Sequence, residues 1–189
     1  MQRLSAGDRS ALNKMVSNRE TAFVVGPPAA GKTTIGRAVA SQIGAEFHTI
    51  DDWTSYVYSP SRQVEPMSDA QIDEALSLLF KEATWHESIY EFAHHDYLGL
   101  LRQNVYPVFT TARKVIVMAS LETCHARNNA RPSRVRSSYV ERAWHSAQSL
   151  IGLCSEDFRN ALVIDTTCTT IGAIVPTVVK FLTSGRVNE

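Results

Sequence analysis

Residues 26–34, which read GPPAAGKTT, constrain the fold more than any other part of the chain. They consist of a glycine, four further residues and then Gly-Lys-Thr. An apolar run at 21–25 precedes them, and a helical pattern from 32 to 43 follows. A glycine-bounded loop between a strand and a helix directs its backbone N–H groups at a single anion. The segment therefore predicts a loop that holds the phosphates of a nucleoside triphosphate.

The residue types within this loop assign roles to its members. Lys32 is placed to reach the β- and γ-phosphates, and the Thr33 hydroxyl is placed to ligate Mg²⁺. Pro27 and Pro28 carry no N–H, so the phosphate cradle has to rely on the amides that follow them. The predicted nucleotide-binding residues are Gly26, Ala29, Ala30, Gly31, Lys32, Thr33 and Thr34.

Length and composition set limits on the class of protein. The 189 residues suit one domain, 1–189, and are too few for two. Lys plus Arg equal Asp plus Glu, 19 against 19, so no overall charge favours a nucleic-acid partner. No apolar run approaches the ~20 residues of a membrane span, and the start lacks the apolar core of a signal peptide. Three cysteines without metal-type spacing indicate reduced, buried thiols and a cytoplasmic location.

The periodicity of apolar residues alternates between strands and helices. Strands are expected at 22–25, 46–50, 86–92, 114–119 and 161–165. Helices are expected before residue 20 and at 32–43, 68–80, 96–103, 122–129 and 171–182. This alternation predicts an α/β protein with a three-layer α/β/α P-loop NTPase fold. Its five-stranded parallel sheet would carry helices on both faces.

Two adjacent carboxylates, Asp51 and Asp52, follow the second expected strand. Ligands of open parallel sheets lie beyond the carboxyl ends of the strands, so these side chains are expected to face Lys32. Asp51 is then a candidate to accept a proton from a substrate hydroxyl, and either residue is a candidate to help hold Mg²⁺. The alternative is that they cap the next helix or form a turn.

A third candidate group surrounds the strand at 86–92. Glu91 lies near its carboxyl end, where a carboxylate would bind substrate or organise the water around Mg²⁺. His94 and His95 follow; as neighbours they point in different directions and make a poor pair of metal ligands. They would either bind substrate or serve as exposed structural residues.

Five arginines stand close together in the segment 127–142. They are Arg127, Arg131, Arg134, Arg136 and Arg142. Because phosphoryl transfer spreads negative charge over the transferred group, such arginines suit a lid that neutralises it and excludes water. Arg127 and Arg131 are the first candidates for this catalytic role. A solvated basic loop, or a patch for an anionic partner such as RNA, is the alternative.

With these residues in view, the chain resembles the small P-loop kinases that share the nucleoside monophosphate kinase fold. Within them it is most similar to the shikimate and gluconate kinases. Four blocks carry the resemblance: 26–34, 47–51, 127–132 and 163–167. It implies that Asp51, nineteen positions after Lys32 (51 − 32), contacts the acceptor hydroxyl, that the arginine block is a lid, and that 163–167 flanks adenine. Similar outlines occur in antibiotic phosphotransferases and zeta-toxin-like kinases.

One departure bears on the acceptor. The Gly-Gly-Gly substrate loop of shikimate kinases is missing, and residues 90–97 stand in that region instead, so shikimate is not the expected acceptor.

Together the motifs and the resemblance predict an ATP- and Mg²⁺-dependent kinase. It would transfer the γ-phosphoryl group to a hydroxyl of a small molecule. The alternatives are an NTP-hydrolysing switch or accessory ATPase that gates partner binding, and a nucleic-acid-end kinase. The acceptor, the choice of ATP over GTP, the lid arginines that act and the oligomeric state stay open at this point.

Overall fold

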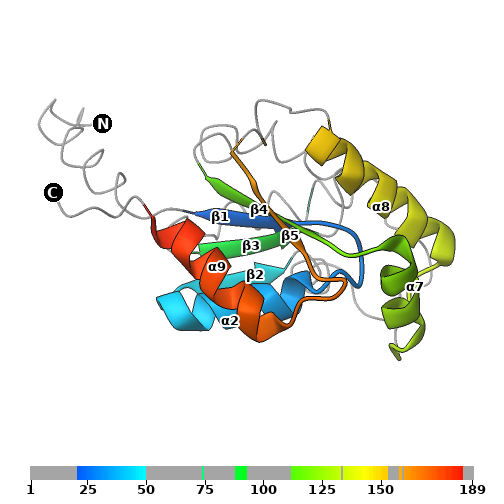
Figure 1. Cartoon of the computed structure of the whole chain (residues 1–189), viewed down its shortest axis with the longest axis horizontal. Helices are drawn as coiled ribbons and strands as arrows, with labels where there is room; N and C mark the ends of the chain where they lie inside the picture. Colours follow the sequence, from blue (N-terminus) through cyan, green and yellow to red (C-terminus); the bar gives the residue numbers. More distant parts are fainter. Residues whose placement is uncertain are drawn as a thin grey trace, which may run out of the picture.

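The computed structural model describes residues 21–49, 74, 88–92, 112–132, 134–152, 158 and 160–184. Within them, five strands form one sheet in the order β2-β3-β1-β4-β5, and every neighbouring pair is parallel (Figure 1). The strands are β1 (Ala22–Val25), β2 (Glu46–Thr49), β3 (Ser88–Phe92), β4 (Arg113–Met118) and β5 (Leu162–Asp165). The predicted five-stranded parallel sheet is confirmed.

Helices lie on both faces of this sheet. They are α2 (Lys32–Ile43), α7 (Leu121–Asn129), α8 (Ser137–Gly152) and α9 (Ile171–Thr183). Helices α2 and α9 pack together on one face, whereas α8 lies on the other, against β4 and α7 (Figure 1). The predicted three-layer α/β/α fold is therefore confirmed as well.

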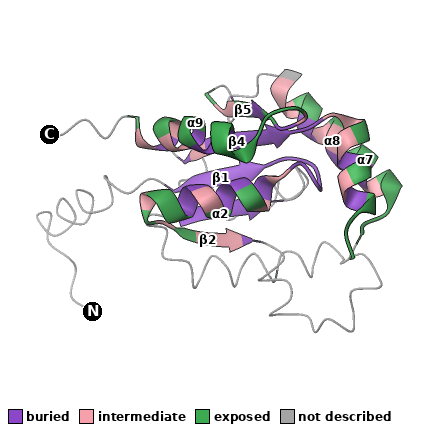
Figure 2. Ribbon diagram, turned by 60° about the horizontal axis from the view of Figure 1, so that its bottom comes forward, coloured by how far each residue is buried: buried purple, intermediate pink, exposed green. Residues whose placement is uncertain are grey.

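The core runs through the three central strands. All residues of β1 and β3 are buried, and so are all but the first of β4, whereas β2 and β5 at the sheet edges expose part of their side chains (Figure 2). A central strand covered on both faces needs such a continuous apolar run. Val25, the last residue of β1, is 1% exposed, so the packed core holds the start of the following loop in place.

The described helices differ from the sequence expectation at one main place. Helix α8 begins inside the arginine segment, where no helix was expected, and continues beyond the end of that segment at residue 142. The segment 127–142 is thus the end of α7, a connection and the start of α8. The thiols also differ from expectation, because Cys124 is buried but Cys168 is exposed.

Several expected elements lie outside the described residues: the helix before residue 20, the helix at 96–103 and, apart from the helical Glu74, the helix at 68–80. None of the helices in the described ranges is long and apolar enough to cross a membrane.

Candidate functional site

The loop at residues 26–31 joins the buried end of β1 to the start of α2. Gly26 has a φ of 149°, and a Cβ built on it would lie 2.0 Å from the Val117 carbonyl oxygen of β4. Only a residue without a Cβ fits there. A turn follows in which the Ala30 N–H donates to the Pro27 carbonyl (3.3 Å), with Ala29 at a φ of 62°. This left-handed alanine is an uncommon conformation of the kind found at binding sites.

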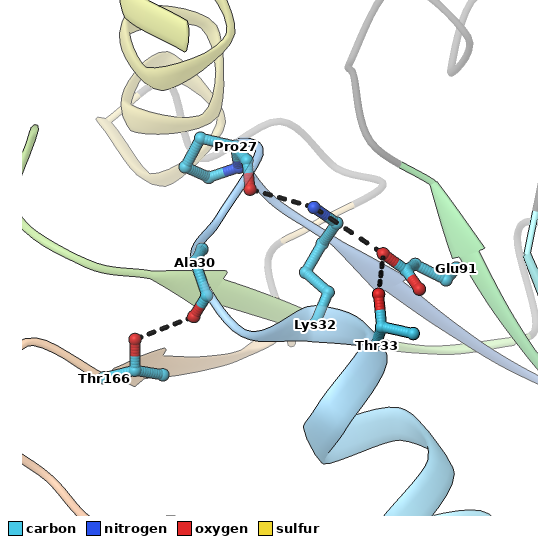
Figure 3. Close-up of polar contacts among 6 residues, drawn as sticks. All are labelled: Pro27, Ala30, Lys32, Thr33, Glu91 and Thr166. Atoms are coloured by element: carbon cyan, nitrogen blue, oxygen red, sulfur yellow. Dashed lines mark hydrogen bonds and ion pairs between the residues drawn. The ribbon is translucent and has the colours of Figure 1, made fainter. Parts of the chain in front are cut away.

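Lys32, the first residue of α2, points back over this loop although it is only 4% exposed. Its Nζ donates to the Pro27 carbonyl at 2.9 Å and lies 3.8 Å from Glu91 Oε1 on β3 (Figure 3). A buried ammonium needs such partners because its desolvation is costly. The positive charge therefore stands at the loop itself, where the sequence places the phosphates.

The side-chain oxygens of Thr33 and Glu91 lie together beside Lys32. The Thr33 hydroxyl donates to Glu91 Oε1 at 3.0 Å (Figure 3). Glu91 is 8% exposed, and β3 neighbours β1 in the sheet with Val24 opposite Glu91. Hydroxyl and carboxylate oxygens are the ligands that Mg²⁺ prefers, so these residues fit the expected metal. The structure joins residues 58 positions apart into one constellation.

On the other side of the loop, Thr166 follows β5. Its hydroxyl donates to the Ala30 carbonyl at 2.7 Å. Arg127 on α7 donates from Nη1 to the same hydroxyl (2.9 Å) and from Nη2 to the Thr166 carbonyl (2.8 Å). The structure thus brings the predicted Arg127 to the phosphate loop, with Thr166 between them.

The segment around Thr166 is itself held from two sides. The Asp165 carboxylate accepts hydrogen bonds from the Thr167 amide (2.8 Å) and hydroxyl (2.6 Å), and these bonds lower the pKa of Asp165. The Thr167 hydroxyl also accepts from the Ser120 amide at 2.7 Å, at the N-cap of α7. The end of β5 and the start of α7 therefore form one unit beside the loop.

The other arginines of the segment lie at the surface. Arg131, Arg134, Arg136 and Arg142 are exposed. Their connection is fastened by Asn128, which is 1% exposed and exchanges two hydrogen bonds with the Val135 backbone: Nδ2 to the carbonyl at 2.9 Å, and the amide to Oδ1 at 3.1 Å. Arg131 is thus carried on a connection whose two ends are tied together.

Two of the candidates predicted from the sequence, Asp51 and Asp52, lie outside the described residues, as do His94 and His95. The strand that leads to the aspartates, β2, is described up to Thr49. Thr49 pairs with Glu91 on β3, and Glu91 pairs in turn with Val24 on β1. The chain leaves β2 level with Glu91 and two residues before Asp51.

Two residues with a role in this arrangement, Thr166 and Asn128, were not singled out by the sequence patterns. Thr166 belongs to the block 163–167 that carries the family resemblance, which was a usable signal. Asn128 belongs to another such block, 127–132, but nothing in its local pattern indicates burial or a partner seven residues away.

Comparison with known proteins places this geometry in context. Residues 22–167 match the model of the ATPase family associated with various cellular activities (AAA). No curated protein matches the chain significantly in sequence.

Solved structures match over most of the chain. Shikimate kinase from Acinetobacter baumannii in complex with shikimate is 15% identical, with a TM-score of 0.63 and coverage of 93% of this chain and 99% of that one. A gluconokinase from Sinorhizobium meliloti 1021 is 16% identical, with a TM-score of 0.63 and coverage of 87% and 91%. Deoxyadenosine kinase from M. mycoides with bound dATP is 14% identical, with a TM-score of 0.61 and coverage of 87% and 100%. The fold of small P-loop kinases predicted from the sequence is confirmed.

Proposed function

The chain belongs to the ATPase family associated with various cellular activities (AAA), and we propose that it uses its phosphate loop as a small-molecule kinase. It would move the γ-phosphoryl group of ATP to a hydroxyl group of the acceptor. The observation that carries this proposal is the contact of the buried Lys32 and Glu91 with the half-buried Thr33 at the loop, beside the strand end that leads to Asp51.

The donor half of the site would be built from the loop and the start of α2. The amides of residues 29–34 and the Lys32 ammonium would hold the triphosphate, with Gly26 and Gly31 permitting the backbone path. Lys32 would exchange its bond to the Pro27 carbonyl for phosphate oxygens. Its charge would then offset the charge that develops on the transferred group.

Mg²⁺ would be held by Thr33 and Asp51, with Glu91 organising the surrounding water. When bound, the ion supplies positive charge against the β- and γ-phosphate oxygens.

The acceptor half would depend on Asp51, with Asp52 and Glu91 beside it. Asp51 would orient the acceptor hydroxyl and take its proton, as a general base must do from within hydrogen-bond reach. The parallel register supports this role, because it brings the end of β2 level with Glu91 and the loop.

Arg127 and Arg131 would offset negative charge from the α7 side. Arg131 is exposed on a tied connection, and Arg127 stands next to the loop through Thr166. The guanidinium group stays charged at any pH of interest and suits this task. A lid formed by the arginine segment would also exclude water, the competing acceptor.

The acceptor class is a hydroxylated small molecule. The named substrates of the similar structures, shikimate among them, support this class. The missing Gly-Gly-Gly loop argues against shikimate for this chain. The protein would act in the cytoplasm, on a nucleotide and a small molecule, and would need no nucleic acid.

The experiment is a screen of hydroxylated metabolites, nucleosides and aminoglycoside-like compounds for acceptor-dependent ADP release. Lys32→Ala should lower turnover by about 10²–10³-fold. Asp51→Asn should lower it by about 10²-fold or more with ATP binding retained. Lys180→Ala, which removes an exposed lysine on α9, is the matched control and should leave turnover unchanged.

Other outcomes would reject the kinase assignment. ADP release that no acceptor accelerates would indicate the switch or accessory ATPase. Salt-sensitive phosphorylation of oligonucleotide ends would indicate the nucleic-acid-end kinase. An Asp51→Asn variant with undiminished transfer would remove Asp51 from the mechanism.

A further inference from the structure

One threonine connects the α7 arginine to the phosphate loop. Thr166 is 5% exposed and lies between Arg127 and Ala30, 136 residues away from Ala30 in sequence (Figure 3 draws its bond to Ala30). We call the set of hydrogen bonds Arg127–Thr166–Ala30 the Thr166 bridge.

The chemistry of the three groups fixes the direction of each bond in the Thr166 bridge. A guanidinium has only donors, so the Thr166 hydroxyl has to accept from Arg127 Nη1 at 2.9 Å. Its single hydrogen is then directed to the Ala30 carbonyl at 2.7 Å. Arg127 also holds the Thr166 carbonyl, and the Thr166 amide donates to Met118 on β4 at 2.8 Å. The hydroxyl therefore has little freedom to turn elsewhere.

The Ala30 carbonyl shares a planar peptide with the Gly31 N–H. In a trans peptide these two groups point in opposite directions. When Thr166 holds the carbonyl on the β5 side, the Gly31 N–H is directed to the opposite side. Gly31, at a φ of 100°, has no side chain that would hinder rotation of this peptide. Backbone hydrogen bonds hold the peptides on either side, from the Ala30 N–H to Pro27 and from the Ile35 N–H to Gly31, and the Thr166 hydroxyl holds the Ala30 carbonyl between them.

We propose that Thr166, held by Arg127, is a positioning residue that orients the Ala30–Gly31 peptide so that the Gly31 N–H donates to bound phosphate. This role rests on the proposed function only in that the loop binds a triphosphate. It also couples α7, which leads into the arginine segment, to the phosphate loop.

The test measures dissociation constants of the full chain for Mg-ATP and for Mg-tripolyphosphate, which lacks base and sugar. Thr166→Val removes the hydroxyl at constant shape and should weaken both by about tenfold. Thr166→Ser keeps the hydroxyl and should bind as the wild type does. Thr183→Val is the matched control, because it also removes a hydroxyl bonded to a carbonyl (Val179, 2.8 Å), but on α9, and should change neither constant.

Arg127→Lys keeps the charge and loses the two-pronged geometry, so it should weaken both probes by about two- to tenfold. Since Arg127 acts here through Thr166, the double variant Thr166→Val/Arg127→Lys should bind no more weakly than Thr166→Val alone. If Thr166→Val does not fold, as seen by circular dichroism, Arg127→Lys and Thr166→Ser still decide the matter.

The proposal is overturned if the wild type binds both probes and Thr166→Val or Arg127→Lys binds them equally well. It is also overturned if the double variant loses as much affinity for the probes as the two single variants lose together. Weakened binding in these variants together with an absence of phosphotransfer to any acceptor would support the Thr166 bridge while rejecting the kinase function. A wild type that binds neither probe would overturn both.

Discussion

Single residues set the shape of the phosphate loop, and Gly26 does so most strictly. Its alanine variant would place a Cβ 2.0 Å from the Val117 carbonyl oxygen and force an L side chain into a φ of 149°. We expect Gly26→Ala to lower the free energy of unfolding by at least about 3 kcal/mol, from strain and overpacking together. Urea denaturation measures this loss.

Gly172 provides the control for that measurement. It lies on α9, where an added Cβ meets nothing within 4 Å. Gly172→Ala should raise the free energy of unfolding by about 0.5–1 kcal/mol, because alanine favours the helix. Equal effects of the two substitutions would contradict the assigned role of Gly26.

Tyr90 is a single residue that should make the stability of the fold depend on pH. Burial raises the pKa of Tyr90 to about 12 from its usual value of 10.0. The folded state then keeps a proton that the unfolded chain loses, so stability is full below pH 10 and falls as pH rises toward 12. We expect a slope of up to about 1.4 kcal/mol per pH unit from this group. Urea unfolding between pH 9 and 12 should show a flatter profile for Tyr90→Phe, and identical profiles would refute the assignment.

At the scale of elements, Asn128 ties the connection between α7 and α8. Asn128→Ala removes both bonds to the Val135 backbone and leaves that backbone without these partners. We expect a loss of about 1–3 kcal/mol in the free energy of unfolding. Asn129→Ala, at the exposed neighbour, should stay within about 0.5 kcal/mol of the wild type. If chemical denaturation gives the same value for both, the tie contributes nothing.

Local patterns predicted the elements well where apolar spacing dominated. The bounds of α2 match the expectation, and β3 occupies 88–92 of the expected 86–92. Helix α8 escaped notice although its buried residues Val140, Ala143 and Ala147 follow helical spacing. The nearby arginines drew the interpretation toward a loop. The charged residues of α8 lie on its exposed face, and the apolar residues on the opposite face still keep the spacing that predicts a helix.

At the scale of the whole molecule, the sequence predicted the parallel sheet but not which distant segments meet beside the phosphate loop. Lys32 and Thr33 could be named as candidates because the pattern of the phosphate loop lies within a few consecutive residues. Glu91 was a candidate from its place near a strand end, and the strand order brings it to the loop. Thr166 and Ala30 are 136 residues apart, so a local sequence pattern could not predict their contact. Asp51 stays a prediction from its offset to Lys32.

Ligand binding at the phosphate loop should raise the stability of the whole chain. A ligand that binds only the folded state adds RT ln(1 + [L]/Kd), about 2.7 kcal/mol at a hundredfold excess over Kd. For a domain of this size, each kcal/mol raises Tm by about 2–4 °C, so Mg-ATP should raise Tm by about 5–11 °C. Differential scanning fluorimetry against Mg-ATP concentration measures the shift.

The Lys32→Ala variant locates that stabilisation. Without the ammonium, the triphosphate loses its main charge partner, so Mg-ATP should raise Tm by little at the same concentration. The variant's own Tm without ligand should also be lower, because the substitution removes the ion partner of the buried Glu91 carboxylate. Lys180→Ala should keep the full shift. A full shift in Lys32→Ala would place the nucleotide somewhere other than the loop at residues 26–34.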